Sequence, residues 1–315
     1  MKTELRMDYG ASQSVETAFI PQDWLCGVKR LFQIAAVFFS LSLTAFAGHV
    51  VRDELGREVT VPDHAHRIVC LAPSITDMLY ALGRGDDIVG ITDYSKYPAE
   101  AVKKPSVGGV IDPSLEKLIS LHPDLVLAAA DLNSPDLIRS IERLGVPVFV
   151  LHPHGFHDIY RSLESVGKAV DGERPAAALV AKLQAREAAV RQRVAGKSRP
   201  SLFFLLWPDP IMSAGRGAFI TELIEAAGGR SVTAELPSEW PSLSLESVLA
   251  DRPEYLLLVR GSHVTLETLR GQGNWIKLDA VRQGKVFYTD DRIEYPSPVA
   301  LDALEDLAGQ IHPAK

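Results

Sequence analysis

Cysteine is scarce in this sequence, which has only Cys26 and Cys70 among its 315 residues. Cys26 precedes an apolar run, whereas a lipid-modified cysteine would follow such a run. Cys70 is the only cysteine after residue 47, and it lies in a strand-like pattern. An intramolecular disulfide is therefore excluded after residue 47, and we expect Cys70 to be a small buried hydrophobic residue.

Basic residues are also too few for one large class of function. The 33 Lys and Arg residues are outnumbered by 40 Asp and Glu residues, which gives a formal net charge of −7 and a pI of about 5.7. The charges within residues 1–47 cancel, so the rest of the chain carries the whole excess. Because a nucleic-acid-binding protein needs a basic face, this composition excludes nucleic acid as a partner.

Common catalytic motifs are absent as well. The sequence has no G-x-S-x-G elbow, no H-E-x-x-H helix and no phosphate-binding loop. Gly215 and Gly217 are followed by Ile220 where a dinucleotide fingerprint has its third glycine. The paired acids Asp86-Asp87 and Asp290-Asp291 stand at predicted turns without an acid–base context. An exported enzyme is therefore the weaker alternative, and we expect a protein that is not an enzyme.

No apolar run is long enough for a comfortable membrane span, which needs about 20 residues. The apolar run Leu31–Thr44 follows the basic pair Lys29-Arg30 and precedes Ala45-Phe46-Ala47, an A-x-A cleavage pattern. We therefore expect residues 1–47 to be a leader with a cleavable signal peptide, and the mature protein to diffuse freely in the periplasm. Residues 1–27 are not typical of a signal, so translation from Val28 is an open alternative.

One segment of the chain occurs twice. Ser114–Leu127 (SLEKLISLHPDLVL) returns 130 positions later as Ser244–Leu257 (SLESVLADRPEYLL). Each copy predicts a short helix, then a stop at Pro123 or Pro253, then a buried strand.

The helix caps of the two copies follow from small polar residues. Ser114 or Asp112 is expected to cap the first helix, with Pro113 in its first turn, and Ser242 or Ser244 the second. An acid follows in the first turn of each helix, where the helix dipole favours it.

A second pair of segments repeats in the same order. A helix from Ser74 to Gly83 follows the strand-like run 67–72, and a helix from Ile220 to Gly228 follows the run 201–206. Two matching pairs predict an α/β protein with two similar lobes, placed at residues 48–152 and 198–315.

The segment between the lobes is predicted to be helical. Within residues 153–197, apolar residues at helical spacing indicate a long helix from Pro175 to Gly196. Such a helix spans about 30 Å and is long enough to join two lobes as one stiff backbone, with a ligand cleft between them.

Three histidines form an H-x-H-x-x-H pattern where a predicted strand ends. Spacing of this kind can bind a transition metal, but His152, His154 and His157 lie in a loop with Pro153 and Gly155. We favour surface or capping histidines and predict no metal site, although metal binding stays open.

These segments together resemble a known family, the substrate-binding proteins of ABC importers for iron chelates and vitamin B12, whose two lobes share a helical backbone. The resemblance covers residues 50–310 and is carried by residues 67–74, 89–98, 114–127, 213–229 and 240–248. It implies a monomeric periplasmic receptor, without a cofactor, that delivers a metal chelate to a permease dimer at the inner membrane. It also implies that Glu116 and Glu246 dock into arginine pockets of the two permease subunits.

Within this family the chain looks most like the cobalamin receptors. Tyr94 matches a tyrosine that stacks on the corrin ring, and Trp240 and Asp291 match an aromatic and an acid of the opposite lobe. Corrinoid binders have Trp where Val110 and Ala129 stand here, and Arg near Tyr295. A haem or ferric-siderophore receptor is therefore the alternative, and a free divalent-metal receptor is a weaker one. The expected ligand-binding residues are Pro73, Ser74, Tyr94, Trp207, Trp240, Asp291 and Tyr295.

Overall fold

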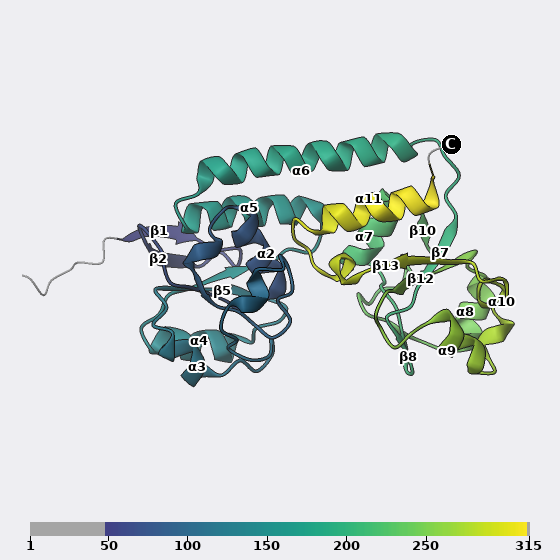
Figure 1. Cartoon of the computed structure of the whole chain (residues 1–315), viewed down its shortest axis with the longest axis horizontal. Coiled ribbons are helices and arrows are strands. Elements are labelled where there is room, and N and C mark those ends of the chain that lie inside the picture. Colours follow the sequence, from purple (N-terminus) through teal and green to yellow (C-terminus); the bar gives the residue numbers. More distant parts are fainter. Residues whose placement is uncertain (1–47, 314–315) are drawn as a thin grey trace, which may run out of the picture. The chain divides into compact units, whose positions relative to one another are not determined.

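Two parallel four-stranded sheets organise the computed structural model, which describes residues 48–313 (Figure 1). The first sheet has the order β4-β3-β5-β6 and the second has the order β10-β7-β12-β13. Numbered along the chain, each sheet has the order second, first, third, fourth, so the repeat extends to the topology. The strands are β3 (Ile68–Cys70), β4 (Ile88–Gly90), β5 (Leu125–Ala129), β6 (Val148–Leu151), β7 (Ser201–Phe204), β10 (Arg230–Ser231), β12 (Tyr255–Val259) and β13 (Val286–Thr289).

Helices cover both sheets, and smaller sheets lie beside them. The helices of the lobes are α2 (Pro73–Ala81), α3 (Leu115–Ser120), α4 (Pro135–Arg143), α7 (Phe219–Ala226), α8 (Leu245–Asp251), α9 (Leu266–Gly271), α10 (Asp279–Gln283) and α11 (Ala300–Ile311), with short 3₁₀ turns η1 (Gly85–Asp87), η2 (Ala101–Lys103), η3 (Trp275–Lys277) and η4 (Asp291–Glu294). The small strands are β1 (Gly48–Arg52) and β2 (Glu58–Pro62), which form a hairpin, and β8 (Trp207–Pro208), β9 (Ile211–Met212) and β11 (Ser242–Leu243), which form a three-stranded antiparallel sheet. The α/β class predicted from the sequence is therefore confirmed.

Two helices connect the sheets. Helix α5 (Phe156–Ala169) is followed by α6 (Glu173–Val194), whose 22 residues span about 33 Å at 1.5 Å each. Helix α6 packs against α5 along the first part of its length and against α11 along the last part, and both lie below it in Figure 1. Arg186 of α6 binds Asp302 at 2.5 Å and Glu305 at 2.8 Å, both on α11. The long backbone helix is thus attached to both lobes.

Strand residues alternate between two apolar clusters. In β5, Leu125 and Leu127 join a cluster with α2, α5 and α6, whereas Val126 packs on the opposite face with α3 and α4. The first of these clusters continues into the second lobe through α7 and α11, so both lobes share one core. Burial on both faces explains why the sequence of these strands is apolar without alternation.

One residue that the sequence predicts to be buried lies in the first of these clusters. Cys70 is fully buried in β3, and burial raises the pKa of its thiol to about 12. Trp275 packs in the core of the second lobe.

The duplicated segment folds the same way twice. Ser114 caps α3 by accepting a hydrogen bond from Lys117 N, and Ser244 caps α8 by accepting one from Ser247 N. The residues before the two prolines, His122 and Arg252, both have a φ of 46°.

One detail of the predicted caps is wrong. Pro113 precedes the N-cap rather than lying in the first turn, because Ser114 has an extended backbone and α3 begins at Leu115.

The predicted leader, residues 1–47, lies outside the described residues, and the predicted lobe boundaries stay predictions. Within residues 48–313, none of the helices has the length and apolar character needed to cross a membrane.

Candidate ligand-binding cleft

A cleft of about 380 Å³ opens between the two lobes. Small-molecule sites typically measure about 300–1,000 Å³, so this cleft has the size of a small-molecule site. On the first lobe its walls come from segments that follow the carboxyl ends of β3, β4, β5 and β6, where open α/β sheets bind ligands. The lining residues are Pro73, Ser74, Tyr94, Val110, Ala129, Asp131, Leu132, Pro153, His154, Gly217, Ala218, Phe219, Glu239, Trp240, Glu294, Tyr295 and Pro296.

Two aromatic side chains stand exposed in this cleft, one on each lobe. Tyr94 is 55% exposed and Trp240 is 43% exposed, although both are large and apolar enough to favour burial. Tyr94 lies in the loop after β4, and Trp240 lies just before β11. Exposed aromatic faces in a cleft are suited to stacking on a flat ligand.

The start of α2 forms another part of the wall. Helix α2 begins at Pro73, and its N-cap, Ala72, has no side chain that can accept from the first N–H groups. Ser74 therefore presents an uncapped helix end to the cleft, where N–H groups are available to a polar ligand atom.

The structure brings together five of the seven residues that the sequence predicted for ligand binding. These are Pro73, Ser74, Tyr94, Trp240 and Tyr295.

Trp207 does not line the cleft. It lies in β8, where its indole N–H donates to Asp209 O at 2.9 Å and its ring packs edge-on against His263. Trp207 was predicted to bind ligand because it is aromatic, but the small antiparallel sheet holds it outside the cleft.

Asp291 lies beside the cleft rather than in its wall. Its carboxylate accepts a hydrogen bond from Tyr97 Oη at 2.5 Å and pairs with Lys96 Nζ at 2.7 Å, and both partners belong to the opposite lobe. Burial and this acceptor raise the pKa of Tyr97, whose ring packs edge-on against Tyr295. Asp291 therefore links the two lobes and supports a residue that lines the cleft.

The positions that depart from the corrinoid-binding pattern face the same cleft. Val110 and Ala129 both line it, and their side chains are smaller than the Trp residues that corrinoid binders have at these positions. Three charged residues that were not predicted from the sequence, Asp131, Glu239 and Glu294, also line it. Glu239 directly precedes Trp240, and Glu294 directly precedes Tyr295. Their position next to predicted cleft aromatics was the one sequence feature that could have indicated them.

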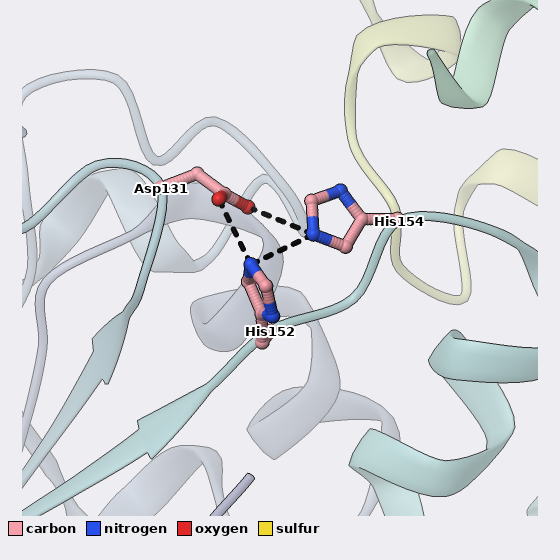
Figure 2. Close-up of side chains that lie close together, drawn as sticks. All are labelled: Asp131, His152 and His154. Atoms are coloured by element: carbon pink, nitrogen blue, oxygen red, sulfur yellow. Dashed lines mark hydrogen bonds and ion pairs between the residues drawn. The ribbon is translucent and has the colours of Figure 1, made fainter. Parts of the chain in front are cut away.

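Only two of the three histidines of the H-x-H-x-x-H pattern lie together in the structure. His152 and His154 approach Asp131, as Figure 2 shows, whereas His157 is exposed on α5 and takes no part in this group. His152 Nε2 lies 3.0 Å from Asp131 Oδ1 and 2.7 Å from His154 Nε2. Asp131 was missed because it lies more than 20 positions earlier and joins the histidines only through the pairing of β5 with β6.

The two predicted docking residues occupy equivalent places. Glu116 lies in the first turn of α3 and Glu246 in the first turn of α8, and both side chains are exposed. Neither is a cleft residue.

A family model described as periplasmic binding protein matches residues 68–293. This match covers more than half of the sequence, so the chain belongs to the periplasmic binding protein family. The family predicted from the sequence is confirmed.

Named relatives include an ABC transporter substrate-binding lipoprotein and vitamin B12-binding proteins. The chain is 29% identical to the uncharacterized ABC transporter substrate-binding lipoprotein YvrC of Bacillus subtilis, over 84% of this chain and 85% of the relative. It is 26% identical to the vitamin B12-binding protein of Vibrio cholerae, over 78% of this chain and 89% of the relative.

Solved structures of similar fold are named for different ligands. The periplasmic heme-binding protein RhuT of Roseiflexus is 30% identical with a TM-score of 0.69, covering 78% of this chain and 97% of its own. The molybdate-binding protein MolA of Haemophilus influenzae has a TM-score of 0.74 at 22% identity, covering 84% of this chain and 91% of its own, and shows the fold alone.

Proposed function

We propose that this protein is a periplasmic receptor that binds a corrinoid or a related metal chelate and delivers it to an ABC importer. The observation that carries the proposal is the pair of exposed aromatic residues, Tyr94 and Trp240, in a cleft between two lobes. The vitamin B12-binding relative supports the corrinoid as ligand. The receptor acts as a monomer, forms no chemical intermediate with the chelate, and needs no cofactor.

A haem is the second candidate, and one feature of the cleft favours it. Val110 and Ala129 provide small side chains where corrinoid binders have Trp, and those binders have an Arg near the position of Tyr295. The 30% identical relative described as heme-binding supports the same alternative. Pro73, Ser74, Tyr94, Trp240 and Tyr295 would contact either ligand.

A fluorescence titration of the purified protein separates the candidates. Cyanocobalamin, haemin and a ferric siderophore are added in parallel, and quenching of tryptophan emission is followed. We expect saturable quenching by cyanocobalamin at submicromolar concentration, which corresponds to about −8 kcal/mol or better. Saturation by haemin or the siderophore alone would retain the transport role and replace the ligand.

Two variants localise the binding. Trp240→Ala should weaken binding of the responding ligand about tenfold or more, because stacking on one cleft wall is lost. Trp207→Phe is the matched control, since Trp207 is equally exposed at 44% but lies outside the cleft. Equal losses in both variants would contradict the cleft as the binding site.

A further inference from the structure

The side chains of Asp131, His152 and His154, all potential metal ligands, converge on one point (Figure 2). Two of them, Asp131 and His154, line the cleft. Asp131 follows β5, and His152 and His154 follow β6. Within residues 48–313 no other group of His, Cys, Asp and Glu brings three ligand atoms this close together.

The distances between the ligand atoms fit one small ion. The two Nε2 atoms are 2.7 Å apart, His152 Nε2 is 3.0 Å from Asp131 Oδ1, and His154 Nε2 is 3.7 Å from Asp131 Oδ2. Ligands about 2.1 Å from a tetrahedral ion lie about 3.4 Å from one another. Small side-chain rotations therefore suffice to bring one nitrogen of each histidine and one carboxylate oxygen around a common centre.

The backbone of the two histidines is held in place by acids. His152 N donates to Glu54 Oε2 at 2.5 Å, and His154 N donates to Asp158 Oδ2 at 3.1 Å. Pro153 between them restricts the backbone further. The pair is thus a positioned group rather than two free surface side chains.

The second lobe supplies a partner for the other nitrogen of His154. Its Nδ1 lies 3.6 Å from Glu239 Oε1. Metal-binding histidines commonly direct their second ring N–H at a carboxylate, which fixes the tautomer and the ring orientation. Glu239 is placed to do this from across the cleft.

We propose that Asp131, His152 and His154 bind a divalent first-row transition ion in the wall of the cleft, with Glu239 orienting His154. Two imidazoles and one carboxylate suit Zn²⁺, Ni²⁺ or Co²⁺ better than Mg²⁺ or Ca²⁺, which prefer oxygen ligands. Three protein ligands leave one position open toward the cleft, which a water molecule or a donor atom of a small molecule fills. Because Glu239 belongs to the opposite lobe, bound metal connects the lobes.

The test uses the untagged purified protein and metal salts without any chelate. Co²⁺ is titrated while its visible absorption is recorded, and Zn²⁺ is titrated by calorimetry. We expect one site per chain and a Co²⁺ spectrum of tetrahedral intensity. His152→Ala should lower the affinity at least 100-fold, and Glu239→Gln should lower it about tenfold, as removal of an outer partner commonly does.

His157→Ala is the matched control, because His157 belongs to the same sequence pattern but is exposed and outside the group. Unchanged binding in His152→Ala, or an equal loss in His157→Ala, would overturn the proposal. Circular dichroism shows whether each variant is folded. If His152→Ala is not folded, His152→Asn replaces it. The titration contains no chelate, and His152 does not line the cleft, so failure of this site and failure of chelate binding are distinguishable.

Discussion

At the scale of single residues, Asp77 shows how a buried acid ties the lobes together. It lies in α2 and is only 6% exposed, and its Oδ2 accepts a hydrogen bond from Val299 N, just before α11, at 3.0 Å. Burial raises the pKa of this carboxyl to about 6, although the hydrogen bond from Val299 opposes the shift. Below about pH 6 this carboxyl is therefore mostly protonated in the folded protein, whereas an ordinary Asp is ionised down to its pKa of 3.8.

The raised pKa predicts a pH dependence of stability. Folding takes up a proton at Asp77 between the ordinary pKa of 3.8 and the folded value of about 6, so stability falls as pH rises through this window. This rise of the pKa from 3.8 to about 6 corresponds to about 3 kcal/mol. Asp77→Asn keeps an acceptor for Val299 N without a charge.

We expect the free energy of unfolding of the wild type, relative to that of Asp77→Asn, to fall by up to about 3 kcal/mol across this window. The difference should become constant about one pH unit above the folded pKa of about 6, where Asp77 is ionised in both the folded and the unfolded state. Urea denaturation of both proteins at a series of pH values measures it. A difference that does not change with pH would contradict the assignment to Asp77.

At the scale of elements, the turn at Gly215 positions one wall of the cleft. Gly215 N donates to Glu239 O at 2.8 Å, and a Cβ at Gly215 would lie 2.1 Å from Ser238 O. The contact is with backbone, which has little freedom to move away. A residue with a side chain at position 215 would displace the segment that carries Trp240.

Gly215→Ala is therefore expected to destabilise the protein by about 2 kcal/mol, as overpacking commonly does. It should also weaken ligand binding in the fluorescence titration. Gly271→Ala is the control, because a Cβ there meets no atom within 4 Å. Thermal unfolding and ligand titration of both variants check the prediction, and equal stability of the two would show that the close approach does not constrain the turn.

At the scale of the whole molecule, the duplication places the same feature on each lobe. Glu116 and Glu246 are exposed in the first turns of equivalent helices, each capped by a serine. A permease with two-fold symmetry presents two equivalent surfaces, so matching acids on the two lobes suit it.

The double variant Glu116→Ala, Glu246→Ala should bind its ligand like the wild type and lose uptake in cells. The residues lie outside the cleft, and each contributes only a few tenths of a kcal/mol to its helix. Ligand titration and a transport assay with labelled ligand measure the two effects. Glu267→Ala, an acid in the first turn of α9, is the control, and normal uptake by the double variant would exclude docking through these acids.

The fold class, the repeated lobes and the family could all be predicted from the amino-acid sequence alone. Apolar periodicity and helix caps act over a few residues, so Ser114 and Ser244, or the strand β5, were recognisable locally. The tertiary structure decided which side chains share the cleft, because parallel strand pairing brings distant loops to one edge. Only that pairing placed Asp131 beside His152, and only the small antiparallel sheet held Trp207 outside the cleft.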